Sequence, residues 1–387
     1  MIQNALTVLV PIRRAEGGAT PPALVELLAA VGDDVMGNPH LRLADSPSTH
    51  FARFVLLDRD PKYPPRLLFS SNHDGDLPGY AAELAANLGA GLDRIFGFCE
   101  GYAPGSAVDG GGLLAFLRSH SLRPAAFYAA YQGSGAAEIR AAAATRARLA
   151  AELDGPGRDA TLAALTPLMP GGPAPPAVRP NAVAAAAGKA LGAAAEWLAG
   201  IRAAPPDRHR RKSADFDLVR IEDLQIQNQM TVVSAVKPGW WPRLFVRVAF
   251  LLVSAQARRA RGSLSGLTTI HFARWVVLDG GERLLFESNY DGSWENYIDD
   301  FVDFASVGMN VIWGTAVDFP RGGARDIEAF KQIIRHYQIP TQVFYSADPS
   351  ATVTNILNDL RLARAVASGR PDEGVRRLVT GSYGAAD

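Results

Sequence analysis

One stretch of this chain occurs twice, and this repeat restricts the possible folds more than any other feature. The first copy starts at His50 and reads HFARFVLLDRDPKYPPRLLFSSNHDG, and the second starts at His271 and reads HFARWVVLDGGERLLFESNYDG. In both copies two apolar arms flank a polar connection, and Asp279-Gly280 in the second copy is a typical hairpin turn. Each copy therefore predicts an antiparallel β-hairpin.

The repeat extends far beyond the hairpin. Matching residues keep an offset of 217 to 224 positions, from Gln3 and Gln227 near the start of each copy to Tyr128 and Tyr345 near the end. A chain of 387 residues is also long enough for two hydrophobic cores. We therefore expect a first unit at 1–153, an Ala-, Pro- and Gly-rich linker with a helix-prone stretch at 154–214, and a second unit at 215–387.

Hydrophobic periodicity predicts the same order of elements in both units: strand, helix, strand, strand, helix, strand. In the second unit we expect helices at 243–257, 294–307, 326–337 and 352–366, and strands after the hairpin at 311–317 and 341–346. This order is that of the split βαβ unit. The predicted fold class is therefore α+β, with two tandem ferredoxin-like units pairing antiparallel sheets into a barrel or sandwich.

The charge balance argues against a nucleic-acid partner, because 39 Lys and Arg residues are matched by 39 Asp and Glu residues. The one cysteine, Cys99, cannot form an internal disulfide, and no zinc-type spacing occurs, so we expect a reducing, cytoplasmic environment. The first residues do not resemble a secretory signal, and no apolar run reaches the roughly 18 residues that span a bilayer.

Two polar residues of the second hairpin are candidates for a site. Alternation along the strand puts His271 and Arg274 on faces that are otherwise mostly apolar. Such groups need a partner or a cavity, since an unpaired buried polar group costs on the order of 1 to 3 kcal/mol. They either make structural bonds shared with His50 and Arg53, or line a pocket in the second unit.

Asp291 ends the second hairpin in the motif Ser-Asn-Tyr-Asp-Gly, with Asp74 as its twin. Its carboxylate either bonds nearby backbone and caps the next helix, or enters the pocket as a proton acceptor. His336 lies at the end of a predicted helix, where a histidine complements the helix dipole or, beside an apolar pocket, serves as axial ligand to a porphyrin iron.

The duplicated plan, the Asp291-Gly292 turn and the later helix histidine resemble the superfamily of dye-decolourising peroxidases and chlorite dismutases. That resemblance implies haem in the second unit, with His336 as the proximal iron ligand and His271 beside the cofactor. It also implies Asp291 as distal acid-base residue and Arg274 as the arginine that stabilises developing charge, although the leading glycine of the family motif is absent. The second half is also similar to uncharacterised bacterial proteins that share Gln-Asn-Gln-Met and His-Phe-Ala-Arg-Trp.

A final feature belongs to the second unit alone. Trp240 and Trp241 precede a short apolar helix that is followed by a run of arginines. This pattern suits either an interfacial membrane anchor or a buried helix with a basic end. Two functions stay open: a haem oxidoreductase of peroxidase type acting on a small, apolar substrate, or a cofactor-free protein that binds a lipophilic ligand or partner at the membrane periphery.

Overall fold

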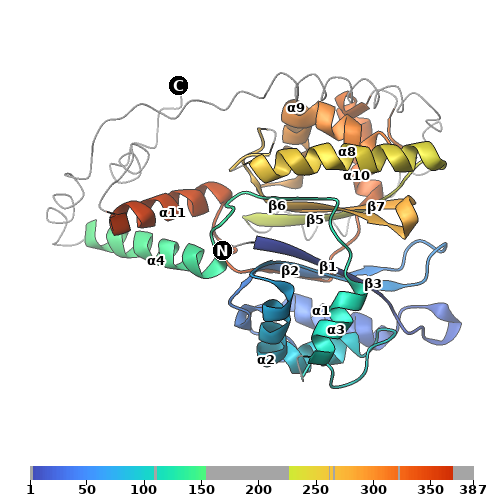
Figure 1. Ribbon diagram of the computed structural model, residues 1–387, viewed down its shortest axis with the longest axis horizontal. Helices are drawn as coiled ribbons and strands as arrows, with labels where there is room; N and C mark the ends of the chain where they lie inside the picture. Colours follow the sequence, from blue (N-terminus) through green and yellow to red (C-terminus); the bar gives the residue numbers. More distant parts are fainter. Residues whose placement is uncertain are drawn as a thin grey trace.

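The computed structural model describes residues 3–108, 111–153, 226–260, 262–264, 266–320 and 323–368. The predicted linker at 154–214 and its helix-prone stretch lie outside the described residues. Figure 1 shows the arrangement of the two halves around a central pair of sheets.

Two four-stranded antiparallel sheets lie face to face at the centre of the molecule (Figure 1), which confirms the α+β class. Sheet one has the order β1 (Gln3–Pro11), β3 (Arg66–Asp74), β2 (Thr49–Leu57) and β8 (Val343–Ser346). Sheet two has the order β4 (Ala126–Ala129), β6 (Ile270–Leu278), β7 (Arg283–Asp291) and β5 (Gln227–Ala235). The halves exchange strands, because β4 of the first half completes sheet two and β8 of the second half completes sheet one.

Both predicted hairpins are confirmed, since β2 pairs with β3 and β6 pairs with β7, each antiparallel. In the second hairpin the turn is built on Asp279, Gly280 and Gly281, all with positive φ. The Asp279 carboxylate accepts hydrogen bonds from Arg66 (2.8 Å) and Arg283 (2.6 Å). Arg66 belongs to the first hairpin, so this turn also joins the two sheets at one end.

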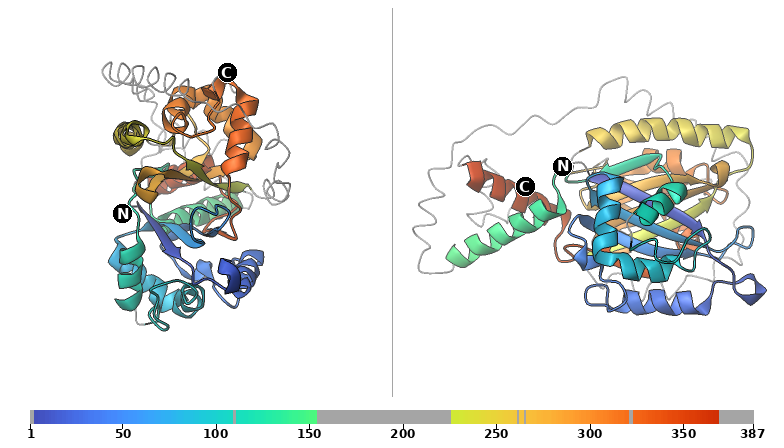
Figure 2. Two further views of the ribbon diagram at one scale, coloured as in Figure 1. Left: turned by 90° about the vertical axis from the view of Figure 1, so that its right-hand side faces the viewer. Right: turned by 60° about the horizontal axis from the view of Figure 1, so that its bottom comes forward.

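Helices cover the outer face of each sheet (Figure 1). Sheet one is covered by α1 (Pro22–Asp33), α2 (Leu77–Phe96) and α3 (Gly111–His120), and sheet two by α8 (Trp240–Arg259), α9 (Trp294–Trp313) and α10 (Ile327–Tyr337). The remaining pair, α4 (Ala136–Leu153) and α11 (Val353–Ser368), packs together and extends past the end of the sheets (Figure 2). None of the described helices combines the length and apolar character needed to cross a membrane.

The strand predicted at 311–317 is wrong. Helix α9 continues through these residues to Trp313, and only Ala316 makes an isolated bridge, to Val236. A short apolar run cannot be assigned to strand or helix by periodicity alone, and here the helix is simply longer than expected. The other predicted helices and strands of the second unit match observed elements to within a few residues.

Three apolar cores result from this layering. One lies between sheet one and α1–α3, the second lies between sheet two and α8–α10, and the third lies between the two sheets. The third is small and consists of aliphatic side chains, among them Val55, Leu68, Val276 and Leu285. The rest of the space between the sheets holds polar side chains and, at one end, an aromatic pair, Phe51 and Phe272, whose ring centroids lie 5.7 Å apart.

Candidate functional site

Each half carries a buried histidine at a β-bulge. In β2 the register shifts between Thr49 and Phe51, and in β6 between Ile270 and Phe272, so His50 and His271 are the extra residues. A bulge turns its side chain out of the regular alternation. It directs His50 to Asp74 (Nε2–Oδ1, 2.9 Å) and His271 to Asp291 (Nε2–Oδ1, 2.7 Å).

The two aspartates also bind the first turns of α4 and α11. Asp74 Oδ2 accepts the Ala136 backbone N–H at 2.7 Å, and Asp291 Oδ2 accepts the Val353 backbone N–H at 2.8 Å. Both oxygens of each carboxylate are therefore engaged. Because a carboxylate only accepts hydrogen bonds, Nε2 of each imidazole is the donor in these two pairs.

The two histidines lie at the same end of the sheets, on either side of the aromatic pair Phe51 and Phe272. The His50 ring lies 5.4 Å from Phe272 and the His271 ring lies 5.4 Å from Phe51, between ring centroids. Tyr131 caps the second histidine, with its hydroxyl 3.2 Å from His271 Nδ1. His271 and Asp291, which the sequence named separately as site candidates, are in direct contact.

A hollow of about 20 Å³ lies beside His50. It is lined by Phe51, Tyr131, Ala136, Ile139, Arg140, Gln227, Ser346, Ala347, Asp348 and Ile356. A space of this size holds about one water molecule or one hydroxyl group. The hollow lies in the first half's histidine site, whereas the sequence favoured the second half.

Arg274 lies between the sheets, away from this end, and is fully committed to main-chain and side-chain oxygens. Its guanidinium donates to Leu6 O (2.5 Å), Thr7 Oγ1 (3.1 Å) and Ser71 O (2.8 Å), and to Asn72 Oδ1. Burial lowers the pKa of Arg274 to about 10, and the Glu287 carboxylate opposes that shift. Arg274 therefore joins the two sheets.

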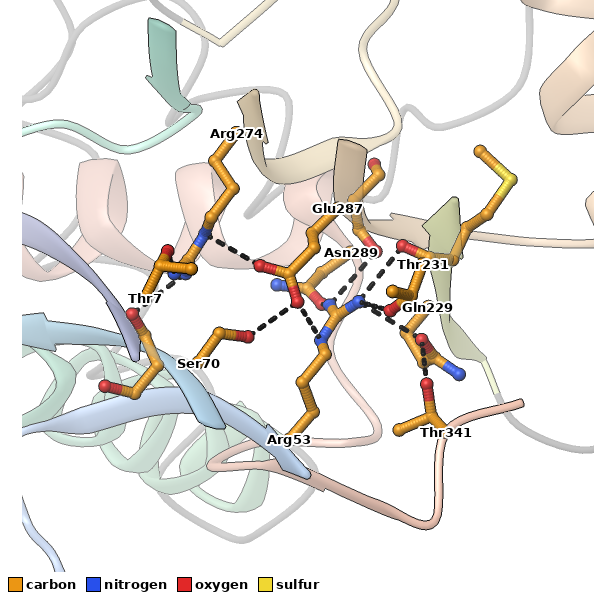
Figure 3. A network of polar contacts seen from close by, with 12 residues as sticks. Thr7, Arg53, Ser70, Gln229, Thr231, Arg274, Glu287, Asn289 and Thr341 are labelled. Atoms are coloured by element: carbon orange, nitrogen blue, oxygen red, sulfur yellow. Dashed lines mark hydrogen bonds and ion pairs between the residues drawn. The ribbon is translucent and has the colours of Figure 1, made fainter. Parts of the chain in front are cut away.

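Arg53 makes the mirror-image set of contacts in the other sheet (Figure 3). It donates to Met230 O (3.0 Å), Thr231 Oγ1 (2.9 Å) and Ser288 O (3.2 Å), and to Asn289 Oδ1. Burial lowers the pKa of Arg53 as well. The reciprocal contacts show that the arginines are structural counterparts, which was the first of the two readings of the sequence.

One carboxylate lies between the two arginines. Glu287 Oε1 is 3.7 Å from Arg53 Nε, and Glu287 Oε2 is 3.5 Å from Arg274 Nε (Figure 3). The equivalent residue in the first half is Ser70, whose hydroxyl donates to Glu287 Oε1 at 2.7 Å. Two buried cations thus share a single anion.

His336 does not join the other predicted residues. It is exposed on α10, with its ring 5.0 Å from that of Tyr337. The layer between sheet two and its helices is filled by aromatic side chains, with Trp275 5.0 Å and Trp313 5.9 Å from Phe286 between ring centroids. Among the described residues, no group of three or more His, Cys, Asp or Glu is placed to hold a metal ion.

These positions do not fit a porphyrin. The proposed iron ligand is on the surface, Asp291 has both oxygens engaged, and Arg274 is bound between the sheets. Haem binding stays a prediction from the resemblance alone.

Helix α8 carries an unusual surface. Five of its large apolar side chains are exposed: Trp240 (73%), Trp241 (46%), Leu244 (43%), Val248 (44%) and Leu251 (71%). The opposite face, with Val246 and Phe250, is buried in the core of sheet two. The sequence left an interfacial anchor and a buried helix open as alternatives. In the structure one apolar face of α8 is buried against sheet two and another apolar face is exposed.

Another buried histidine was not noticed in the sequence. His73 is 2% exposed, its ring stacks on Tyr80 at 4.0 Å, and neither ring nitrogen has a hydrogen-bond partner. Burial, helped by the Arg274 guanidinium and opposed by Asp74, lowers the pKa of His73 to about 3. The equivalent residue, Tyr290, stacks on Tyr297 in the same way at 3.8 Å.

Sequence reasoning missed Glu287, Tyr131 and His73 because it followed what the two copies share. The signal for all three is a difference at matched positions: Ser70 against Glu287, Tyr131 against Asp348, and His73 against Tyr290. In a duplicated chain, a residue of one copy can be substituted while the matching residue of the other copy keeps its structural role.

The comparisons with known proteins place this geometry in no family. No protein-family model matches the chain, and neither a curated protein nor a solved structure matches it.

Proposed function

We propose that this chain is a peripheral membrane-binding protein that docks α8 on an anionic bilayer. The observation that carries the proposal is the exposed apolar stripe of α8. Trp240, Leu244, Val248 and Leu251 are three or four positions apart, so they follow one face of the helix. Contiguous exposed apolar surface of this kind marks an interaction site, whereas single exposed apolar residues are ordinary.

The charge of α8 favours a lipid surface as the occupant of this stripe. Its sequence, WWPRLFVRVAFLLVSAQARR, contains four arginines and no acidic residue. Arg247 is exposed beside Val248, and Arg243 is partly exposed and pairs with Glu282 at 3.2 Å. Each basic residue near an anionic leaflet contributes about 1 kcal/mol of attraction. The cytoplasmic leaflet, which is rich in anionic lipids, is the proposed location.

The two tryptophans at the start of α8 suit contact with the headgroup region of a bilayer. Indole rings prefer the headgroup region, where an apolar body and a polar N–H are both satisfied. Trp240 and Trp241 lie at the start of α8 with ring centroids 5.5 Å apart, and both are exposed. An interfacial helix would lie along the surface with this face immersed and with its other face packed on the sheet.

Vesicle co-sedimentation tests this function. The full chain should sediment with vesicles that contain phosphatidylserine and less well with phosphatidylcholine alone. The double variant Trp240→Ser, Leu251→Ser should weaken binding more than tenfold, because burial of each large apolar side chain is worth about 1.5 to 3 kcal/mol. The matched control is Val25→Ser, which changes an exposed apolar residue on α1, the equivalent helix of the first half.

Two outcomes would reject the proposal. One is equal sedimentation of the double variant and the wild-type chain. The other is a dimer in gel filtration that the double variant converts to monomer while no vesicles are bound, since a second copy would then be the occupant of the stripe.

We also infer that each half is a ferredoxin-like unit and that the two halves form a fused α+β barrel or sandwich. Beside the free edge of β1, Ile12 bridges Cys99 and Val8 bridges Ser121, and beside β5 there are equivalent bridges at Val236 and Val232. These short pairings lie where the last strand of a split βαβ unit belongs. An experimental structure without these short pairings beside β1 and β5 would contradict the inferred ferredoxin-like units.

A further inference from the structure

Three basic side chains from both halves lie near the N-terminal half of α8. Arg243 Nη2 is 3.2 Å from Glu282 Oε1, and Lys62 Nζ is 2.7 Å from Glu282 Oε2, so the two cations bind different oxygens of one carboxylate. Arg247 lies one helical turn beyond Arg243 and is exposed. We call Lys62, Arg243 and Arg247 the basic cluster. A side chain of the first half thus extends the basic side of a helix in the second half.

Lys62 reaches this position from a loop that only the first half has. The connection between β2 and β3 contains residues 59–65, whereas the matched turn of the second half contains only residues 280–282. Three residues of the longer loop are prolines, which restrict its backbone. Tyr63 also donates to Glu282 Oε2 at 2.8 Å, so two neighbouring residues hold the loop against the turn. The longer loop therefore places a cation beside α8.

The carboxylates at this end of the molecule leave the basic cluster with an excess of positive charge. Glu282 is the carboxylate that contacts the cluster, and one negative charge cannot balance three cations. Asp279 accepts hydrogen bonds from Arg66 at 2.8 Å and from Arg283 at 2.6 Å. Asp60 lies 3.9 Å from Arg283. Both of these acids thus face arginines outside the basic cluster.

We propose that the basic cluster binds a lipid whose headgroup is a phosphomonoester, as in phosphatidic acid, and this inference rests on the proposed docking of α8 on a bilayer. A phosphomonoester carries about −1.5 to −2 charge at pH 7 and has three acceptor oxygens. These oxygens suit two guanidinium groups and one ammonium group. Phosphatidylserine and phosphatidylcholine each carry a cationic group as well, which the excess positive charge of the cluster repels.

The position of the cluster favours a lipid over a soluble phosphate ester. Helical spacing puts Arg243 and Arg247 on one side of the exposed apolar stripe that contains Trp240, Leu244 and Leu251. When the stripe enters the boundary between headgroups and acyl chains, cations at its side lie at the level of the lipid phosphates. A soluble ester would make no use of the stripe.

Vesicle co-sedimentation at matched surface charge tests the headgroup. Vesicles that contain phosphatidic acid and vesicles that contain phosphatidylserine are adjusted to the same zeta potential, and the dissociation constant of the full chain is measured for each. The wild type should bind the phosphatidic acid vesicles more tightly. Lys62→Gln should reduce this preference about fivefold. Arg361→Gln, which removes an exposed positive charge from α11, should retain the full preference.

The outcomes distinguish this inference from the proposed function. Binding to phosphatidylserine vesicles without a preference for phosphatidic acid would overturn the headgroup assignment and leave the docking of α8 in place. Equal losses with both lipids in Lys62→Gln would also overturn it, because Lys62 would then act only through general attraction. Displacement of the chain from phosphatidic acid vesicles by excess glycerol 3-phosphate would show that a soluble ester is the ligand. Lys62 is exposed and its ion pair lies at the surface, so Lys62→Gln should fold.

Discussion

The first half's His50–Asp74 pair and the second half's His271–Asp291 pair make the same bonds in different surroundings. Each aspartate bonds one histidine and one helix N-terminus, which fixes the end of its sheet. Only the residue received from the other half differs, Asp348 beside His50 and Tyr131 beside His271. The comparison teaches that the bonds common to both halves build the frame, and that the unmatched residues are where a specific role can arise.

The equivalent helices α1 and α8 also share their packing on the sheets and differ in the residues that they expose on the surface. Helix α1 has two acidic residues and one large exposed apolar residue, Val25. Helix α8 has no acidic residue and an exposed stripe that begins at Trp240. Both helices pack on their sheets through their inner faces, so the difference concerns what each half presents to its environment.

The largest expected effect on stability comes from a substitution that removes the difference between Ser70 and Glu287. Glu287→Ser gives the second half the residue of the first and leaves Arg53 and Arg274 buried without a carboxylate. Breaking a buried ion pair in this way costs about 3 to 5 kcal/mol. The free energy of unfolding, measured with urea, should fall by that amount.

The matched control for this change is Ser70→Ala. It removes one hydrogen bond to Glu287 and keeps the carboxylate, so the expected loss is about 1 kcal/mol. Equal losses in the two variants would show that Glu287 does not balance the arginines.

A second difference, His73 against Tyr290, predicts acid sensitivity. In the unfolded chain a histidine has a pKa of about 6.5, whereas in the folded protein the pKa of His73 is about 3. The unfolded state therefore takes up a proton first as the pH falls, and stability decreases from about pH 6.5 downward. At pH 5 the loss should be about 2 kcal/mol.

His73→Phe keeps a ring on Tyr80 and removes the proton-binding nitrogens, so urea unfolding of this variant should lose about 2 kcal/mol less between pH 7 and pH 5 than that of the wild type. His336→Gln, at an exposed position, should retain the wild-type loss. If His73→Phe and the wild type respond alike to acid, His73 has the same proton affinity in the folded and unfolded states, which contradicts the prediction.

The smallest expected effect concerns the charge of α8. Arg247→Gln should weaken binding to phosphatidylserine vesicles by about 1 kcal/mol, which is about fivefold. Arg361→Gln, at an exposed position of α11, should leave binding unchanged. Screening by salt should reduce the difference between the wild type and Arg247→Gln, and a difference that persists at high salt would point to a role other than attraction to lipid.

Much of the frame could be predicted from the sequence, because it depends on local patterns. The Asp279-Gly280 turn and the apolar arms beside it specify the second hairpin, and Asp326 caps α10 close to the predicted start. The end of α9 could not be predicted, since its last apolar residues suit either a helix or a strand. The exchange of β4 and β8 depends on pairing between residues far apart in the chain, and no local pattern reports such pairing.

The site was predicted only in part. His271 and Asp291 were each singled out, and they recur as His50 and Asp74, but recurrence alone did not show that they contact each other. Arg274 was given a catalytic role by resemblance, and its actual partners, the main chain and side chains of β1 and β3, lie more than 200 residues away, where no local pattern reports them. His336 was grouped with them by resemblance, and the structure places it on the surface.

Ser70 and Glu287 occupy equivalent places and contact each other, so they lie at the axis that relates the halves. An assembly of two identical chains must repeat whatever side chain stands there, giving two acids or two hydroxyls. A single acidic side chain between two basic ones requires two halves that differ in sequence at this position, as the halves of this chain do. Fusion of the halves thus permits a charge at the middle of the molecule that strict symmetry forbids.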